Sequence, residues 1–164
     1  MKQTFTRIFF VAMVTLATST LFAQRAALSG EWKLDEKKSE LGEFARAATS
    51  IKTEQKDDAI TITRVTPGFN GGDPMTNTVT LTFDGKVVES EGFRGSKRKS
   101  TAKWSEDAKT LVVSSTMSFE RDGQTSEFKS TESWSITKDG QLSVVTQSNS
   151  PRGESTVKAI YTKK

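Results

Sequence analysis

Apolar residues in this chain recur at every second position over long stretches, with serine or threonine between them. In the segment 76–83, for example, Val79, Leu81 and Phe83 alternate with threonines. A period of two is typical of a β-strand with one buried face and one wet face, whereas a helix would need apolar spacings of three and four. The alternation therefore predicts an all-β fold built from antiparallel strands.

Short polar turns separate the alternating segments. Three of them contain an Asp-Gly pair, at 84–85, 122–123 and 139–140, and such pairs favour tight hairpin turns because they tolerate positive φ. Strands joined by tight turns to their neighbours form an up-and-down meander. The predicted strands are 29–35, 50–55, 59–65, 76–83, 86–91, 97–104, 109–119, 125–137, 141–148 and 154–162.

The length of the predicted strands indicates whether the meander stays open or closes into a barrel. The segments 109–119 and 125–137 exceed the usual five or six residues of a strand. Long meandering strands with one apolar face close economically into a barrel, which leaves no exposed edges. We expect a closed barrel of about 8–10 strands, with the apolar face inward rather than turned to lipid. The segment 36–49 has helical spacing of its apolar residues and predicts one short helix or loop after the first strand.

The first 23 residues have the three-part pattern of a secretory signal. Lys2 and Arg7 precede an apolar stretch, and small residues lead to Ala23 as the residue before the cleavage point. An uncleaved membrane anchor is the alternative, but threonines and a serine interrupt the apolar run before the roughly 20 residues that a span needs. We therefore expect removal of 1–23 and a single barrel domain over 24–164, exported to the periplasm or the medium without a transmembrane anchor.

Composition excludes several classes of function. The chain has no cysteine and no histidine, so it lacks disulfides, thiol catalysis, a histidine base and the usual histidine zinc sites. Loss of Lys2 and Arg7 would leave 22 basic and 20 acidic residues. That net charge of +2 is too small to indicate nucleic acid as a partner. Carboxylate pairs fall only at predicted turns or strand ends, so we predict no catalytic, metal or cofactor site.

Several short segments resemble one family of barrels. The tetrapeptide SGEW, which ends at Trp32, is similar to the Gly-x-Trp opening of the lipocalin and wider calycin group. The segments DGK, STAKW, KTLVV, TESWSITKDGQL and YTKK resemble small exported bacterial lipocalin-like proteins of unknown function. The resemblance implies a ligand-holding barrel with Trp32 closing one end. Lipocalins also carry a late arginine that packs on this tryptophan, and here the last strand offers Lys158 and the turn before it Arg152.

Three charged side chains fall on predicted apolar faces: Arg64, Arg98 and Glu132. A buried charge costs several kcal/mol unless it is paired, so the pattern favours either an internal ion pair or a polar patch for a ligand headgroup. Arginine suits a carboxylate, because its planar fork donates two parallel hydrogen bonds. Arg64 and Arg98 also lie near strand ends, where long side chains can reach water.

These residues predict a non-catalytic binding protein that holds a small, mostly apolar ligand with an anionic end. Arg64 and Arg98 are expected to bind the anion, with Glu132 orienting them. Large side chains on the same predicted faces are expected to line the walls, although each fits a packed core as well. These wall residues are Trp104, Trp134, Phe128 and Met117.

Two other classes of function remain open. A packed interior without a ligand would indicate a module that binds a cell-envelope protein or surface. The basic segment 93–99 (FRGSKRK) fits either an anionic surface, such as lipid headgroups, or a solvated hairpin end. A carboxylate-dependent enzyme built on Glu132 is the third candidate.

Overall fold

The structure is a computed structural model that describes residues 24–42, 47–68, 71–92, 96–121, 124–150 and 153–164. The predicted signal, residues 1–23, therefore lies outside the described part of the chain. The described residues form ten strands: β1 (Gly30–Leu34), β2 (Ser50–Gln55), β3 (Ala59–Thr66), β4 (Met75–Thr82), β5 (Val88–Glu91), β6 (Lys97–Trp104), β7 (Thr110–Arg121), β8 (Gln124–Ile136), β9 (Leu142–Ser150) and β10 (Gly153–Lys163). The prediction of an all-β chain with about ten strands is confirmed.

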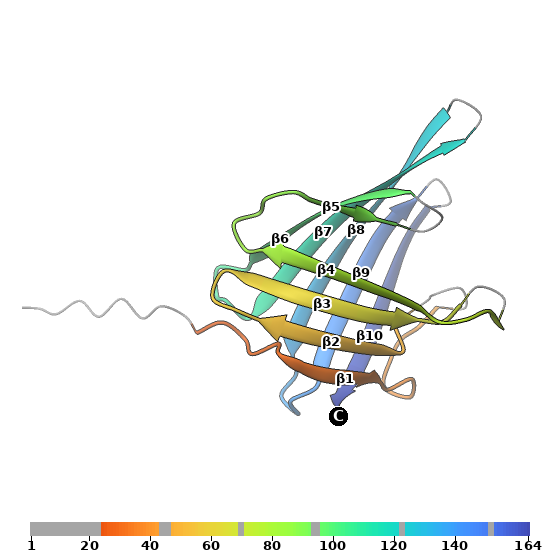
Figure 1. Cartoon of the computed structure of the whole chain (residues 1–164). Helices are drawn as coiled ribbons and strands as arrows, with labels where there is room; N and C mark the ends of the chain where they lie inside the picture. Colours follow the sequence, from red (N-terminus) through yellow and green to blue (C-terminus); the bar gives the residue numbers. More distant parts are fainter. Residues whose placement is uncertain (1–23, 43–46, 69–70, 93–95, 122–123, 151–152) are drawn as a thin grey trace, which may run out of the picture.

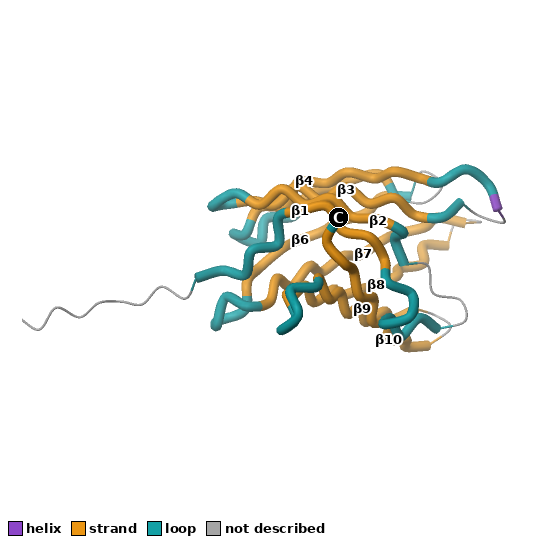
Figure 2. The backbone as a smooth tube through the Cα atoms, turned by 90° about the horizontal axis from the view of Figure 1, so that it is seen from below, coloured by secondary structure: helices purple, strands orange, loops and turns teal. Residues whose placement is uncertain are grey.

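All ten strands belong to one sheet, in the order β4-β3-β2-β1-β10-β9-β8-β7-β6-β5. Because β1 pairs with β10 in antiparallel register, the first and last strands of the meander join and the sheet curls round on itself. Figure 1 shows β1 to β4 crossing in front of β7 to β10, and Figure 2 shows β3 and β4 on the side opposite β9 and β10. Since β4 and β5 stand at the two ends of the order, the barrel is nearly but not fully closed.

Two of the three predicted Asp-Gly turns are present, and 122–123 lies outside the described residues. In the first turn, the Asp84 carboxylate accepts hydrogen bonds from the Thr82 hydroxyl at 2.6 Å and from the Lys86 backbone N–H at 3.0 Å. The bond from Thr82, followed by those from Lys86, lowers the pKa of Asp84 to about 2. The glycines complete the turns with positive φ, 77° at Gly85 and 72° at Gly140. The 139–140 turn joins β8 to β9, which pair antiparallel, so the hairpin predicted there is confirmed. The hairpin predicted at 84–85 is wrong: the turn forms, but β4 pairs only with β3 and β5 only with β6, and the two strands stand at opposite ends of the sheet order.

Replacing Gly140 with alanine should lower the free energy of unfolding by about 1 kcal/mol, because a side chain at positive φ is strained. A Cβ atom built at Gly140 meets nothing within 4 Å, so backbone strain is the whole expected cost. Urea denaturation measures the change. Gly140→Asn is the matched control and should lose about half as much, since asparagine tolerates this conformation better. Equal losses in the two variants would contradict the strain argument.

The segment after β1 contains turn and loop where it is described, in 35–42 and 47–49. The Ser39 hydroxyl donates to the Asp35 carbonyl at 2.7 Å, and Glu40 forms an isolated β-bridge with Lys158. These contacts hold the segment against β10. Of the predicted short helix or loop, the described parts are loop, and residues 43–46 lie outside the described chain.

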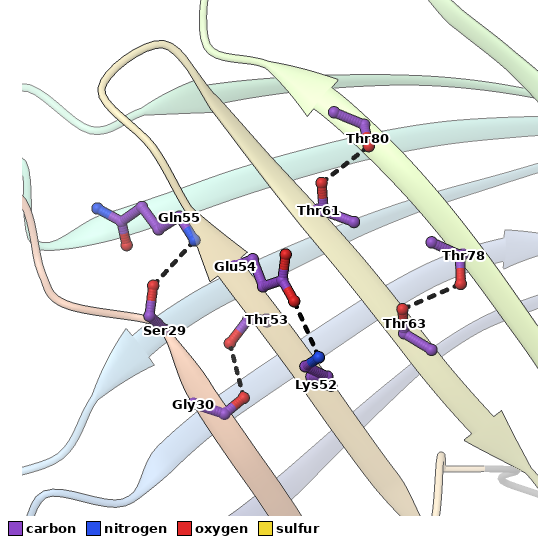
Figure 3. A network of polar contacts seen from close by, with 10 residues as sticks. All are labelled: Ser29, Gly30, Lys52, Thr53, Glu54, Gln55, Thr61, Thr63, Thr78 and Thr80. Atoms are coloured by element: carbon purple, nitrogen blue, oxygen red, sulfur yellow. Dashed lines mark hydrogen bonds and ion pairs between the residues drawn. The ribbon is translucent and has the colours of Figure 1, made fainter.

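The apolar faces point into the barrel, as the alternation predicts. Each fully buried leucine or isoleucine contributes about 1.5–3 kcal/mol relative to an exposed one. The largest buried side chains are Trp32, Trp134, Leu28, Ile60, Ile62, Leu81, Leu111 and Leu142. On the outer face, threonines of β3 and β4 form cross-strand hydrogen bonds, between Thr61 and Thr80 at 2.9 Å and between Thr63 and Thr78 at 3.0 Å (Figure 3). The same strands therefore supply both core and polar surface.

Trp32 lies in the core, with only 2% of its surface exposed. Its indole N–H donates to the Leu28 carbonyl and to the Thr53 hydroxyl, each at 3.1 Å. The ammonium of Lys163 lies 5.6 Å from the centroid of the Trp32 ring. Among the residues that the structure describes, the cation packed on this tryptophan is Lys163, whereas Lys158 pairs with Glu40 at 3.0 Å. Arg152, the other candidate, lies outside the described residues.

No helix in the described part of the chain is long and apolar enough to cross a membrane.

Candidate ligand-binding site

A cavity of about 640 Å³ lies inside the barrel, toward the end where β3 finishes and β4 and β6 begin. This volume falls within the range of about 300–1,000 Å³ that is usual for small-molecule sites. Its apolar lining comes mainly from Ala48, Ile51, Trp134, Val144, Val157, Ala159 and Tyr161. Its charged lining includes Arg64, Arg98 and Glu132, so the three charges predicted to face inward meet in one place.

Arg64 and Glu132 form an ion pair between β3 and β8. An Nη2 atom of Arg64 lies 2.5 Å from Glu132 Oε2, and each side chain is only 18% exposed. The indole N–H of Trp134 donates to the same carboxylate oxygen at 3.0 Å, and the Arg64 guanidinium carbon lies 5.1 Å from the centroid of the Trp134 ring. Both contacts with Trp134 hold the two side chains in place, so Arg64 and Glu132 pair with each other without needing a ligand.

Arg98 has no comparable partner. Its Nε atom is buried and has no hydrogen-bond partner among the described residues. Burial lowers the pKa of Arg98, the positive charge of Arg64 lowers it further, and Glu132 raises it. The guanidinium nevertheless stays charged at neutral pH, because arginine does not deprotonate in proteins. The cavity wall thus contains a partly buried cation whose buried Nε–H donor has no partner among the described residues.

The charges of this cluster do not cancel. Arg64, Arg98 and Glu132 together leave one positive charge, and Glu91, which also lines the cavity, is exposed to water at the rim. The phenol of Tyr161 adds no negative charge at neutral pH, since burial raises its pKa to about 12. A bound group with a single negative charge would therefore neutralise the interior.

A second, smaller cavity of about 270 Å³ adjoins this cluster. It contains the predicted wall residues Met117 and Phe128, and it shares Arg98 and Glu132 with the larger cavity. Phe128 is 37% exposed and packs edge-on against Phe119, with ring centroids 5.3 Å apart. Six of the seven predicted ligand-binding residues therefore line one cavity or both, and their role in binding remains a prediction.

Trp104 is placed differently from the prediction, which put it in the ligand-binding wall. It lies at the other end of β6 from Arg98 and is not among the described residues that line the two cavities. Its ring packs edge-on against Phe83 at 5.6 Å, and the Arg25 guanidinium lies 4.9 Å from Phe83 and 5.9 Å from Trp104. The alternation of apolar residues places Trp104 on the correct face of β6. It does not specify where along the barrel axis the side chain lies.

Sequence reasoning missed several cavity residues. Tyr161, the single tyrosine of the chain, lines the larger cavity beside Val157 and Ala159 of the same strand. The alternation of Val157, Ala159 and Tyr161 along β10 could have identified Tyr161 as an inward-facing residue. Asn77 of β4 also lines the cavity, although it lies among exposed threonines and nothing in its local sequence marks it.

Metal binding finds no support in this arrangement. Among the described residues, no group of three or more aspartate or glutamate side chains is placed to hold an ion.

Comparison with known proteins supports the fold. No protein-family model and no curated protein matches the sequence. Among solved structures, the chain is similar to zebrafish ileal bile acid-binding protein in complex with cholic acid, with a TM-score of 0.51 and 18% sequence identity. The alignment covers 83% of this chain and 98% of the zebrafish protein. At this identity the likeness concerns the fold alone, and it supports an antiparallel, nearly closed β-barrel with a calycin-like backbone.

Proposed function

We propose that this chain is an exported, non-catalytic binding protein that holds a small, mostly apolar ligand with an anionic end inside the barrel. The observation that carries the proposal is Arg98, a partly buried cation at the cavity wall whose buried Nε–H has no hydrogen-bond partner among the described residues. A buried donor without an acceptor costs about 1–3 kcal/mol, and more when it is charged. A ligand anion removes this cost when it binds, so the apo protein is poised for an anion.

The rest of the cavity favours an amphiphile over a small inorganic anion. Ile51, Trp134 and Val144 provide a surface that gains free energy when an apolar group displaces water from it. The barrel of similar backbone was solved with cholic acid, which is an amphiphile with a carboxyl group. Export of this chain is proposed separately, from the pattern of residues 1–23.

The envelope-binding module was predicted to have a packed interior. A cavity of about 640 Å³ lined by inward-facing residues weighs against that alternative, because a fully packed interior would leave no space of this size. We therefore retain one proposed function.

Replacing Arg98 with methionine should weaken binding of an anionic amphiphile by about 30-fold, because a charged hydrogen bond in a desolvated site is lost. The experiment uses the purified chain 24–164 and myristate or cholate as probes. Isothermal titration calorimetry measures the affinity, and native mass spectrometry detects any small molecule that co-purifies.

Lys97→Met is the matched control. It removes the same charge one residue earlier on β6, where the side chain is exposed, and it should change affinity less than twofold. An equal loss of affinity in the two variants would show that the net charge of the protein, and not a contact with Arg98, causes the weakening. Absence of binding to every probe by the unmodified protein would overturn the proposed function.

A further inference from the structure

The two cavities differ in chemistry, and they meet at the same charged residues. Arg98, Glu132, Thr146 and Ser148 line both of them. Half of the twenty residues that line the larger cavity are polar or charged, and its apolar surface includes Ile51, Trp134 and Val144. In the smaller cavity, every lining residue except Met117 and Phe128 is polar or charged.

We propose that the smaller cavity is a second subsite of the ligand site, and that the ligand carries its negative charge within its length rather than at its end. The inference rests on the proposed function, in that a mostly apolar anion binds Arg98 inside the barrel, and it moves the charge from the end of that ligand to a point within its length. An apolar tail occupies the larger cavity, the internal anion contacts Arg98, and a polar group beyond the anion occupies the smaller cavity. A phosphodiester that joins an acylated glycerol to a small alcohol has this order of groups and a single negative charge.

The position of Arg98 supports this order. Arg98 lies opposite Met117 in the pairing of β6 with β7, and Met117 lies opposite Phe128 in the pairing of β7 with β8. The guanidinium therefore stands at the boundary between the cavities. A terminal carboxylate at Arg98 would leave the hydroxyls of the smaller cavity to water, whereas a polar extension would bind them directly.

The charge balance supports a monoanion in particular. Arg64 is held by Glu132 at 2.5 Å, whereas the buried Nε–H of Arg98 has no hydrogen-bond partner among the described residues. Lys129 also lines the smaller cavity, but its ammonium lies 3.9 Å from the Glu127 carboxylate and its side chain is 69% exposed, so it adds no net charge to the interior. A doubly charged phosphate monoester at this position would lie close to the Glu132 carboxylate and bring one negative charge too many into the interior. Repulsion by Glu132 thus selects a diester over a monoester.

Two main probes with a 14-carbon tail test the proposal, and myristyl phosphate is added as a third. Myristate has its negative charge at the end of the molecule, and 1-myristoyl-lysophosphatidylglycerol has its negative charge within the molecule. We expect the diester to bind the chain 24–164 about tenfold more tightly than myristate. Myristyl phosphate, a monoester, should bind more weakly than the diester. Titration calorimetry below the micelle concentration of each probe measures the three affinities.

Ser130 separates the two cavities experimentally, because it lines the smaller one and is not among the residues of the larger. Ser130→Phe should fill the subsite, abolish the tenfold preference and leave myristate affinity within about twofold. Ser130→Ala is the matched control and should keep at least half of the preference. Thermal unfolding of both variants confirms that they are folded.

The outcomes separate the two proposals. Binding of myristate with no preference for the diester, or a preference that Ser130→Phe leaves unchanged, would overturn the second subsite while the proposed function stands. Failure of all three probes to bind would overturn both.

Discussion

Trp32→Ala should lower the free energy of unfolding by about 4 kcal/mol, because it deletes a large buried side chain and leaves a cavity. The loss also removes the indole N–H, so that the Leu28 carbonyl and the Thr53 hydroxyl each lose a donor that now lies 3.1 Å away. Urea denaturation of the chain 24–164, with a two-state fit, measures the change.

Two variants test the cause of this effect. Trp32→Phe keeps most of the ring and should cost about 2 kcal/mol, from lost volume and lost hydrogen bonds. Trp104→Ala removes the same residue type from a half-buried position and should cost less than Trp32→Ala. A loss below about 1 kcal/mol for Trp32→Ala would show that this tryptophan does not close the barrel end.

Glu132→Leu should lower the free energy of unfolding by about 3 kcal/mol, because it leaves the Arg64 guanidinium without its partner in a largely desolvated site. The Arg98 charge aggravates the loss, since Glu132 is the carboxylate that offsets both arginines. The double variant Arg64→Met/Glu132→Leu should recover at least half of the loss, because it removes the uncompensated cation. Chemical denaturation of the three proteins provides the comparison.

The ion pair of Lys99 and Glu89 is the matched surface control. Its atoms are 3.5 Å apart and both side chains are 60% exposed, so Glu89→Leu should cost less than about 1 kcal/mol. A similar loss for Glu89→Leu and Glu132→Leu would contradict the view that burial gives the inner pair its importance. Failure of the double variant to recover stability would show that Glu132 acts through contacts other than Arg64.

The interior therefore combines a fixed part and an open part. Arg64, Glu132 and Trp134 contact one another and need no ligand, while Arg98 lacks a hydrogen-bond partner for its Nε among the described residues. The Glu132 carboxylate offsets part of the Arg98 charge from a distance but accepts no hydrogen bond from the Arg98 Nε–H, so an anion can bind this donor without a preceding rearrangement of the ion pair.

Much of this arrangement follows from local sequence. Alternation identified the strands and the inward face of each, because successive side chains of a strand point to opposite sides. It placed Arg64, Arg98 and Glu132 inside, and the Asp-Gly pairs identified the tight turns at Gly85 and Gly140. Each of these features depends on a few neighbouring residues, so the sequence alone contains them.

The tertiary structure decided how the strands align around the barrel. Arg64 and Glu132 are 68 positions apart, and their contact depends on the pairing of β1 with β10, which brings the two halves of the meander together. The same alignment places Arg98 beside the cavity and Trp104 away from it, although both lie on one face of β6. A period of two specifies which face of the sheet a side chain lies on, but not its position along the barrel axis. That position depends on the register of every pair of strands around the barrel.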